Sequence, residues 1–272
     1  MNHPQIAAFA RLAKENSLPT RALEGQKTMI SRTMHSLAYD SIHDEIIVNS
    51  PLAQAILIFR GGANGEEAPI RVIQGPRTQI QGTDYDGNDQ MTYDEVHGEV
   101  FIPVAGNKIL AFSRESNGDV PPLRVLAGPD TQIRGTVRGH PRIGVDPVHN
   151  LLIVSSSGER GSGGSMLIFD RTASGNVKPK AVIAGPKTGI GGGGAPHIYP
   201  EKGLIIGGCT GGSICAWSVN DSGDVPPRWK IPVQQMTGVG PSGIAIDAVH
   251  KELIVTSGNR NRVMTFSLPE VF

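Results

Sequence analysis

The sequence predicts an all-β fold, a β-propeller with five blades of four antiparallel strands each. One observation behind this prediction is a segment of about 25 residues, clearest at residues 108–133, which returns about every 50 residues. Another is a series of short apolar hairpins between these copies. The composition agrees, because 35 glycines and 20 prolines spread along 272 residues suit many short strands joined by turns. A repeat of this length with four strands per unit is typical of propeller blades.

The first two strands of each blade are predicted by a hairpin pattern. Two runs of strand-forming residues flank a polar turn, in which an aspartate is followed three positions later by a histidine, as at Asp40 and His43. Because this pair recurs in four blades, we interpret it as turn structure, with the aspartate accepting hydrogen bonds from the turn. The fourth of the five hairpins lacks the pair. The hairpins are Leu37–Val48, Met91–Ile102, Ile143–Val154, His197–Ile206 and Ile244–Val255.

The third strand of each blade is a short apolar run that ends in an aromatic residue, and the fourth strand follows a proline. We expect each aromatic side chain to fill the space between neighbouring sheets. In three copies a Gly-Pro-x-Thr tail follows the fourth strand. The aromatic residues are Phe9, Phe59, Phe112, Phe169, Trp217 and Phe266.

The number of blades follows from the number of strands. Four blades are complete within the chain, and the last hairpin is followed by its third strand, Arg262–Ser267, shortly before the chain ends. The missing fourth strand is predicted to be Thr20–Glu24, laid beside Arg262–Ser267, which would protect an otherwise unpaired edge. This gives five blades in a single domain of residues 1–272, and six blades is the alternative.

One segment, Gln5–Phe9, is surplus to this scheme. It repeats the third-strand pattern, but Val263–Phe266 already takes that position. Ile6, Phe9 and Leu12 recur at helical spacing, so residues 1–14 are predicted to form a cap segment with a short helix. Pairing of the segment with another molecule is the alternative.

Charge and composition exclude several classes of partner. With 25 basic and 25 acidic residues the chain has no formal net charge, which disfavours nucleic acid. We find no secretory signal and no apolar run long enough to span a bilayer, so we expect a cytoplasmic protein without membrane contact, and a monomer. Cys209 and Cys215 could bridge a hairpin, but we favour reduced thiols that pack as small hydrophobic groups.

The last repeat resembles the NHL family. Pro241-Ser-Gly-Ile-Ala-Ile-Asp247, followed by a strand, an Asn/Arg turn and Val263-Met-Thr-Phe266, is similar to the pattern of an NHL repeat. The other repeats match mainly in their strands and aspartate turns. The resemblance implies a propeller, although most members have six blades. It also implies a range of functions, including protein and RNA binding, lactone hydrolysis and lyase chemistry at a histidine-bound zinc, among which the fold does not choose.

Candidate binding residues stand just before the first strand of each blade, where a propeller presents side chains to its central channel. Three imidazoles and an open position suit a catalytic transition-metal site, so His35, His140 and His197 are the candidate ligands of a divalent metal. In that reading Asp89 acts as a base and Arg142 holds a substrate anion. The alternative is that these groups only solvate the channel. The candidate binding residues are His35, Asp89, Gln90, His140, Arg142 and His197.

Three functions remain open from the sequence. The leading hypothesis is a propeller that binds a small molecule or a peptide at the mouth of its channel. The second is a metal-dependent lyase or hydrolase at the histidine cluster, so the sequence leaves open whether the protein is an enzyme. The third is a protein-interaction scaffold. The glycine-rich segments 155–164 and 191–194 are expected to border the channel mouth.

Overall fold

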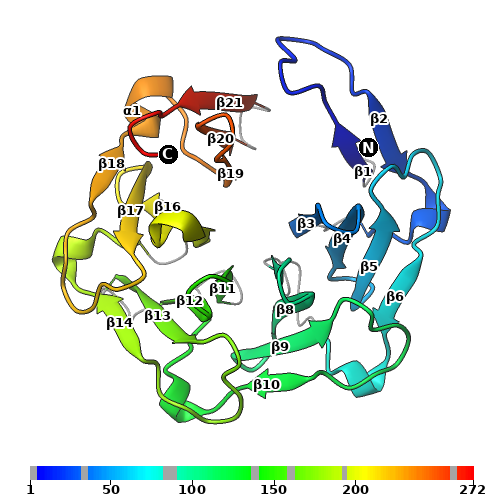
Figure 1. The fold of residues 1–272 in the computed structure, drawn as a ribbon, viewed down its shortest axis with the longest axis horizontal. Helices are drawn as coiled ribbons and strands as arrows, with labels where there is room; N and C mark the ends of the chain where they lie inside the picture. Colours follow the sequence, from blue (N-terminus) through cyan, green and yellow to red (C-terminus); the bar gives the residue numbers. More distant parts are fainter. Residues whose placement is uncertain are drawn as a thin grey trace. The chain divides into compact units, whose positions relative to one another are not determined.

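The computed structural model describes residues 5–31, 36–81, 91–135, 141–157, 163–191, 195–257 and 262–272. The fold class is all-β, with the five small antiparallel sheets of a five-bladed β-propeller (Figure 1). The only α-helix in these ranges is α1 (Val233–Thr237), and no helix in them is long and apolar enough to cross a bilayer. The chain divides into two compact units, Met1–Val125 and Leu126–Phe272, and each is described by itself.

The first unit contains one complete blade, and nearly all of a second. In both sheets the strands pair in sequence order, so each blade is a simple meander. The first blade comprises β3 (Ser36–Asp40), β4 (Glu45–Ser50), β5 (Ala55–Arg60) and β6 (Arg71–Gln74). The second comprises β7 (Thr92–Asp94), β8 (Glu99–Val104), β9 (Lys108–Ser113) and β10 (Arg124–Leu126), whose last residue belongs to the second unit.

The second unit contains three further sheets, shown in green to red in Figure 1. The first comprises β11 (Arg142–Asp146), β12 (Leu151–Ser157), β13 (Gly164–Asp170) and β14 (Ala181–Ala184). The next comprises β15 (His197–Tyr199), β16 (Leu204–Cys209), β17 (Ser213–Ser218) and β18 (Trp229–Ile231). The last has three strands, β19 (Gly243–Asp247), β20 (Glu252–Ser257) and β21 (Arg262–Ser267).

The N-terminal segment forms a strand, so the predicted helix is wrong. Gln5–Ala8 is β1, which pairs antiparallel with β2 (Arg21–Glu24), with Ile6 opposite Leu23. This register matches Ile56 opposite Ile73 in the first blade, so β1 behaves as a third strand and β2 as a fourth. Pairing brings Ile6 against the buried cluster around Leu23, whereas Phe9 and Leu12, which a helical stripe would bury, stay exposed.

The predicted pairing of Thr20–Glu24 with Arg262–Ser267 does not occur among the strand pairs of the described residues. Both edges of β2 are used within the first unit: β1 lies on one edge, and Leu23 forms a parallel bridge to Gly65 on the other. The β1 segment lies close in sequence and carries the same pattern as the other third strands. Local pairing of consecutive strands is common.

The third strands carry the hydrophobic core. Phe59, Phe112, Phe169 and Trp217 are all at most 1% exposed, which confirms their predicted role as fillers. The Trp217 Nε1 group also donates a hydrogen bond to the carbonyl of Thr188. Phe266 is only partly buried, and Phe9 is 54% exposed, because Phe9 follows a strand that belongs to a sheet of only two.

The Gly-Pro-x-Thr tail holds each fourth strand to the loop of the following repeat. In the first blade Gly75 has φ 133°, and a Cβ atom there would lie 2.5 Å from Asp119 Oδ1. The same Oδ1 accepts a hydrogen bond from the backbone N–H of Arg77, and the Thr78 hydroxyl donates to the carbonyl of Gly75. Glycine is therefore required where the acidic side chain closes over the tail. Equivalent contacts join Gln26 to Glu66, Asp130 to Asn176 and Lys187 to Asp224.

The aspartate–histidine turns have the predicted structural role. Asp40 Oδ1 accepts hydrogen bonds from the backbone N–H groups of Ile42 and His43, and its Oδ2 lies 2.8 Å from His43 Nδ1. The same 2.8 Å contact closes the three other turns. These histidines therefore belong to the blade scaffold.

Candidate functional site

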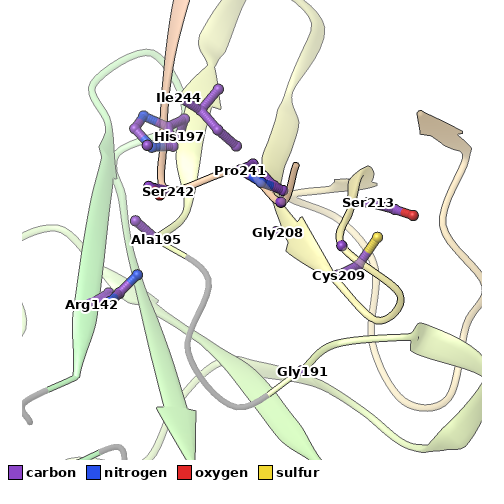
Figure 2. Close-up of a pocket in the computed structure, with 13 residues that line it drawn as sticks. Arg142, Gly191, Ala195, His197, Gly208, Cys209, Ser213, Pro241, Ser242 and Ile244 are labelled. Carbon is purple, nitrogen blue, oxygen red and sulfur yellow. The ribbon is translucent and has the colours of Figure 1, made fainter. Parts of the chain in front are cut away.

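A pocket of about 340 Å³ opens at the ends of the β11, β15 and β19 strands of the second unit. Its walls come from the first residue of β11, from the segments that lead into β15 and β19 together with the first residues of those strands, and from the hairpin between β16 and β17 (Figure 2). The lining residues are Arg142, Gly191, Ala195, His197, Gly208, Cys209, Gly212, Ser213, Gly240, Pro241, Ser242, Gly243 and Ile244.

Two predicted site residues, Arg142 and His197, line this pocket from neighbouring blades. Arg142 is the first residue of β11 and stands opposite Ser155 of β12. His197 begins β15 and stands opposite Ile206 of β16. The innermost strands of these two blades contact each other, which brings the guanidinium and the imidazole to one wall.

The imidazole of His197 is held in its neutral form. Burial of the ring lowers its pKa from 6.5 to about 4, and the positive charge of Arg142 acts in the same direction. At neutral pH the pocket therefore contains the Arg142 cation and an uncharged imidazole. None of the described residues that line it carries a carboxylate.

The opposite wall is the β16–β17 hairpin, whose two strands are joined by a disulfide bond between Cys209 and Cys215. The prediction of reduced thiols is therefore wrong. Cys209 is opposite Ser213 and Cys215 is opposite Gly207, so the bond runs diagonally between adjacent strands. Their Cα atoms are 5.8 Å apart, within the usual span of a disulfide.

Glycines bring the backbone to the surface of the pocket. Gly212 has φ +63°, and a Cβ atom there would lie 2.0 Å from Gln234 Oε1. A side chain at this position would clash with α1, so the hairpin tip is bare backbone. Gly208, Gly240 and Gly243 also line the pocket, which gives a ligand close access to backbone amide and carbonyl groups.

Four other predicted site residues lie outside the described residues: His35, Asp89, Gln90 and His140. The metal hypothesis depends on two of them, His35 and His140. The described part of the pocket offers one imidazole and no carboxylate, whereas a catalytic zinc takes three protein ligands. Across the described residues, no group of three or more metal-binding side chains occurs. A divalent metal held by His35, His140 and His197 stays part of the alternative hypothesis, the metal-dependent lyase or hydrolase.

The β16–β17 hairpin contributes pocket residues that the sequence analysis did not identify: Gly208, Gly212 and Ser213, together with Cys209. The sequence signal was weak, since Thr210-Gly-Gly212 reads as an ordinary turn. Gly191, in contrast, comes from a glycine-rich segment that was expected to border the site.

No protein-family model matches this chain, and no curated protein matches it significantly. The NHL resemblance therefore rests on the residue pattern of the last repeat. The fold class and the pocket define a β-propeller with an open pocket of mixed polar and apolar lining in its second unit.

Proposed function

We propose that this β-propeller is a binding protein that holds a small molecule in the pocket lined by Arg142 and His197. The observation that carries the proposal is the pocket itself, to which three consecutive blades contribute residues. Its size lies at the lower end of the roughly 300–1,000 Å³ range of ligand pockets. Polar groups on one wall and bare backbone on the other supply the few directed contacts that small-molecule sites use.

The composition of the lining supports binding over chemistry. Arg142 is the one charged side chain among the described lining residues, and the neutral His197 is the one imidazole. A nucleophile activated by a neighbouring base needs both groups within hydrogen-bond reach, whereas the Ser213 hydroxyl donates to the backbone carbonyl of Gly211, which is not a base. The proposal therefore includes no chemical step.

The proposal is tested by screening a library of metabolites of mixed charge for compounds that raise the unfolding temperature of the protein. Calorimetry then measures the affinity of each hit. Ser242 lines the pocket and is exposed, so Ser242→Trp is expected to fill the site and weaken binding at least tenfold. Ser222→Trp is the matched control, because Ser222 is exposed in the β17–β18 connection and does not line the pocket.

The proposal fails if no compound of any charge stabilises the protein. It also fails if Ser242→Trp and Ser222→Trp bind the hits equally well, because binding would then lie elsewhere. Binding only of peptides longer than the pocket can enclose would favour the peptide-binding alternative.

A further inference from the structure

The outer edge of β21 has no neighbouring strand among the strand pairs of the described residues (β21 is red in Figure 1). β21 pairs with β20, whereas the third strands of the four-stranded sheets each pair with a fourth strand as well. Val263 shows the consequence. It precedes Phe266 by three residues, as Ile56 precedes Phe59, yet Val263 is 71% exposed and Ile56 is fully buried. An open edge that also exposes an apolar side chain is a template for a further strand.

Three complete blades show which kind of residue belongs opposite Val263. At the equivalent position of the third strand, an apolar side chain lies opposite an isoleucine of the fourth strand, and it is at most 1% exposed. A strand that covers β21 in this register would therefore place an isoleucine or a similar aliphatic residue beside Val263. The pairs in the complete blades are Ile56 with Ile73, Met166 with Ile183 and Ile214 with Ile231.

An ion pair between the second and fourth strands specifies a further residue of the fourth strand. Arg71 donates to Glu45 at 2.5 Å. Arg124 donates to Glu99 at 2.6 Å. In both blades the glutamate is the first residue of the second strand, and the arginine is the first residue of the fourth. The two complete blades without the glutamate also lack the arginine, so the two residues occur together. These blades have Leu151 with Ala181 and Leu204 with Trp229 at the two positions.

The last blade carries this glutamate. Glu252 is the first residue of β20, and the described sheet holds no fourth strand to match it. Glu45 accepts a hydrogen bond from Arg114 at 2.8 Å as well as from Arg71, so a glutamate at this position can bind the arginine of a fourth strand while it keeps another interaction. In the first blade the arginine stands two residues before the isoleucine that lies opposite the third strand. The pattern Arg-x-Ile therefore matches both Glu252 and Val263.

We propose that the open edge of β21 docks an extended segment of a partner protein that carries the pattern Arg-x-Ile. The segment adds antiparallel to β21 as the fourth strand of the last blade. Its arginine pairs with Glu252, and its isoleucine packs against Val263. Backbone hydrogen bonds along the edge supply affinity, and the two side chains supply specificity. No residue of Arg262–Ser267 is among the described residues that line the pocket, so this interaction is separate from the proposed binding of a small molecule.

The probe is a peptide with the sequence of residues 68–75, Ala-Pro-Ile-Arg-Val-Ile-Gln-Gly, because it contains the fourth strand of the first blade. It is acetylated, amidated and labelled with a fluorophore, and its anisotropy is measured during titration with the full chain. We expect saturable binding, which weakens about tenfold when the arginine of the peptide is replaced by glutamate. A peptide of the same composition in scrambled order is the control.

Variants of the protein connect the binding to β21. Val263→Asp is expected to weaken binding of the peptide about tenfold, because the charge would be buried beneath the added strand. Glu252→Arg should weaken the unchanged peptide and restore binding of the peptide that carries glutamate, because the two charges are exchanged. Val249→Asp is the matched control, since Val249 is 86% exposed in a turn of the same blade, outside β21, and should leave the affinity unchanged. Thermal midpoints confirm that each variant is folded.

Amide hydrogen exchange locates the contact. In the free protein the amides of β21 that do not bond to β20 should exchange rapidly, and the peptide should protect them. Protection of these amides before the peptide is added would show that the edge is already covered, and would overturn the inference. A dimer that forms with rising concentration and that Val263→Asp dissociates would show that a second copy occupies the edge, which overturns it as well.

The titrations give further outcomes that overturn the inference. One is absence of binding by the Arg-x-Ile peptide, and another is binding that neither Val263→Asp nor Glu252→Arg changes. Equal binding of the scrambled peptide would show that β21 has no preference for the pattern. The proposed small-molecule function is unaffected by each of these outcomes, because it is tested with ligands of the pocket and with Ser242→Trp.

Discussion

Asp40 shows how one buried carboxylate supports the scaffold. It is fully buried, and burial alone would raise its pKa, but hydrogen bonds from Tyr93, at 2.6 Å, and from His43 outweigh this and hold its pKa below the usual range. A depressed carboxyl pKa stabilises the folded state above the unfolded pKa. That stabilisation is lost as the pH falls through the folded pKa.

Tyr93→Phe removes one of these donors and keeps the ring. We expect the variant to lose about 1–2 kcal/mol of stability at neutral pH and to unfold in acid at a higher pH than wild type. Urea denaturation across the acid range measures both effects. The control is Tyr39→Phe, whose hydroxyl donates to Asp44 on the surface and should matter little. Equal losses in the two variants would contradict this account of Asp40.

Because the folded protein keeps His197 neutral, we expect its free energy of unfolding to decrease in mild acid. Its pKa is about 4 in the folded protein against 6.5 for a free imidazole, so the unfolded chain takes up the proton first. The contribution of the neutral ring is complete above pH 6.5 and decreases as the pH falls from there towards 4. We expect His197→Gln to flatten the stability profile in this window. A profile as steep as that of wild type would show that the ring is not desolvated.

The side chain that closes over each Gly-Pro-x-Thr tail makes a contact that can be tested by itself, and it comes from Asp119, Asn176 or Asp224. Asp119 accepts from the N–H of Arg77 at 2.7 Å, as a helix N-cap residue would. Asp119→Ala should cost about 1 kcal/mol in chemical denaturation, whereas Asp119→Asn keeps an acceptor and should cost less. Equal losses for the two variants would indicate a role for charge instead.

The β16–β17 hairpin connects the disulfide to the pocket. Cys209, Gly212 and Ser213 are lining residues, so the bond between Cys209 and Cys215 constrains a wall of the site. A double Cys209→Ser, Cys215→Ser variant should lose roughly 2 kcal/mol of stability, because a short closed loop restricts the unfolded chain. It should also bind pocket ligands more weakly. Dithiothreitol should reproduce both effects in wild type and leave the variant unchanged.

The sequence repeat predicted most of the fold, whereas it predicted only part of the pocket. The period, the filler aromatics and the aspartate–histidine turns specify the sheets, because each depends on residues close in sequence. The role of Gln5–Phe9 was harder to predict, since Ile6 and Phe9 fit a helical spacing and a strand equally well, and pairing with β2 decides between them. The pocket depends on side chains from separate blades, and nothing local in sequence places Cys209 or Gly212 beside Arg142.

The metal content of the purified protein separates the binding hypothesis from the hypothesis of metal-dependent chemistry. The pocket residues that the structure describes give a metal one imidazole donor, and a stable site needs three or four. The proposed binding function includes no metal, so it predicts that protein purified without a nickel column contains less than about a tenth of an equivalent of transition metal, and that a chelator leaves its unfolding midpoint unchanged. About one equivalent of zinc, lost together with stability in chelator and in a His197→Ala variant, would instead support the lyase or hydrolase hypothesis. His250→Ala is the matched control, because that histidine closes a turn onto Asp247 and should leave the metal content unchanged.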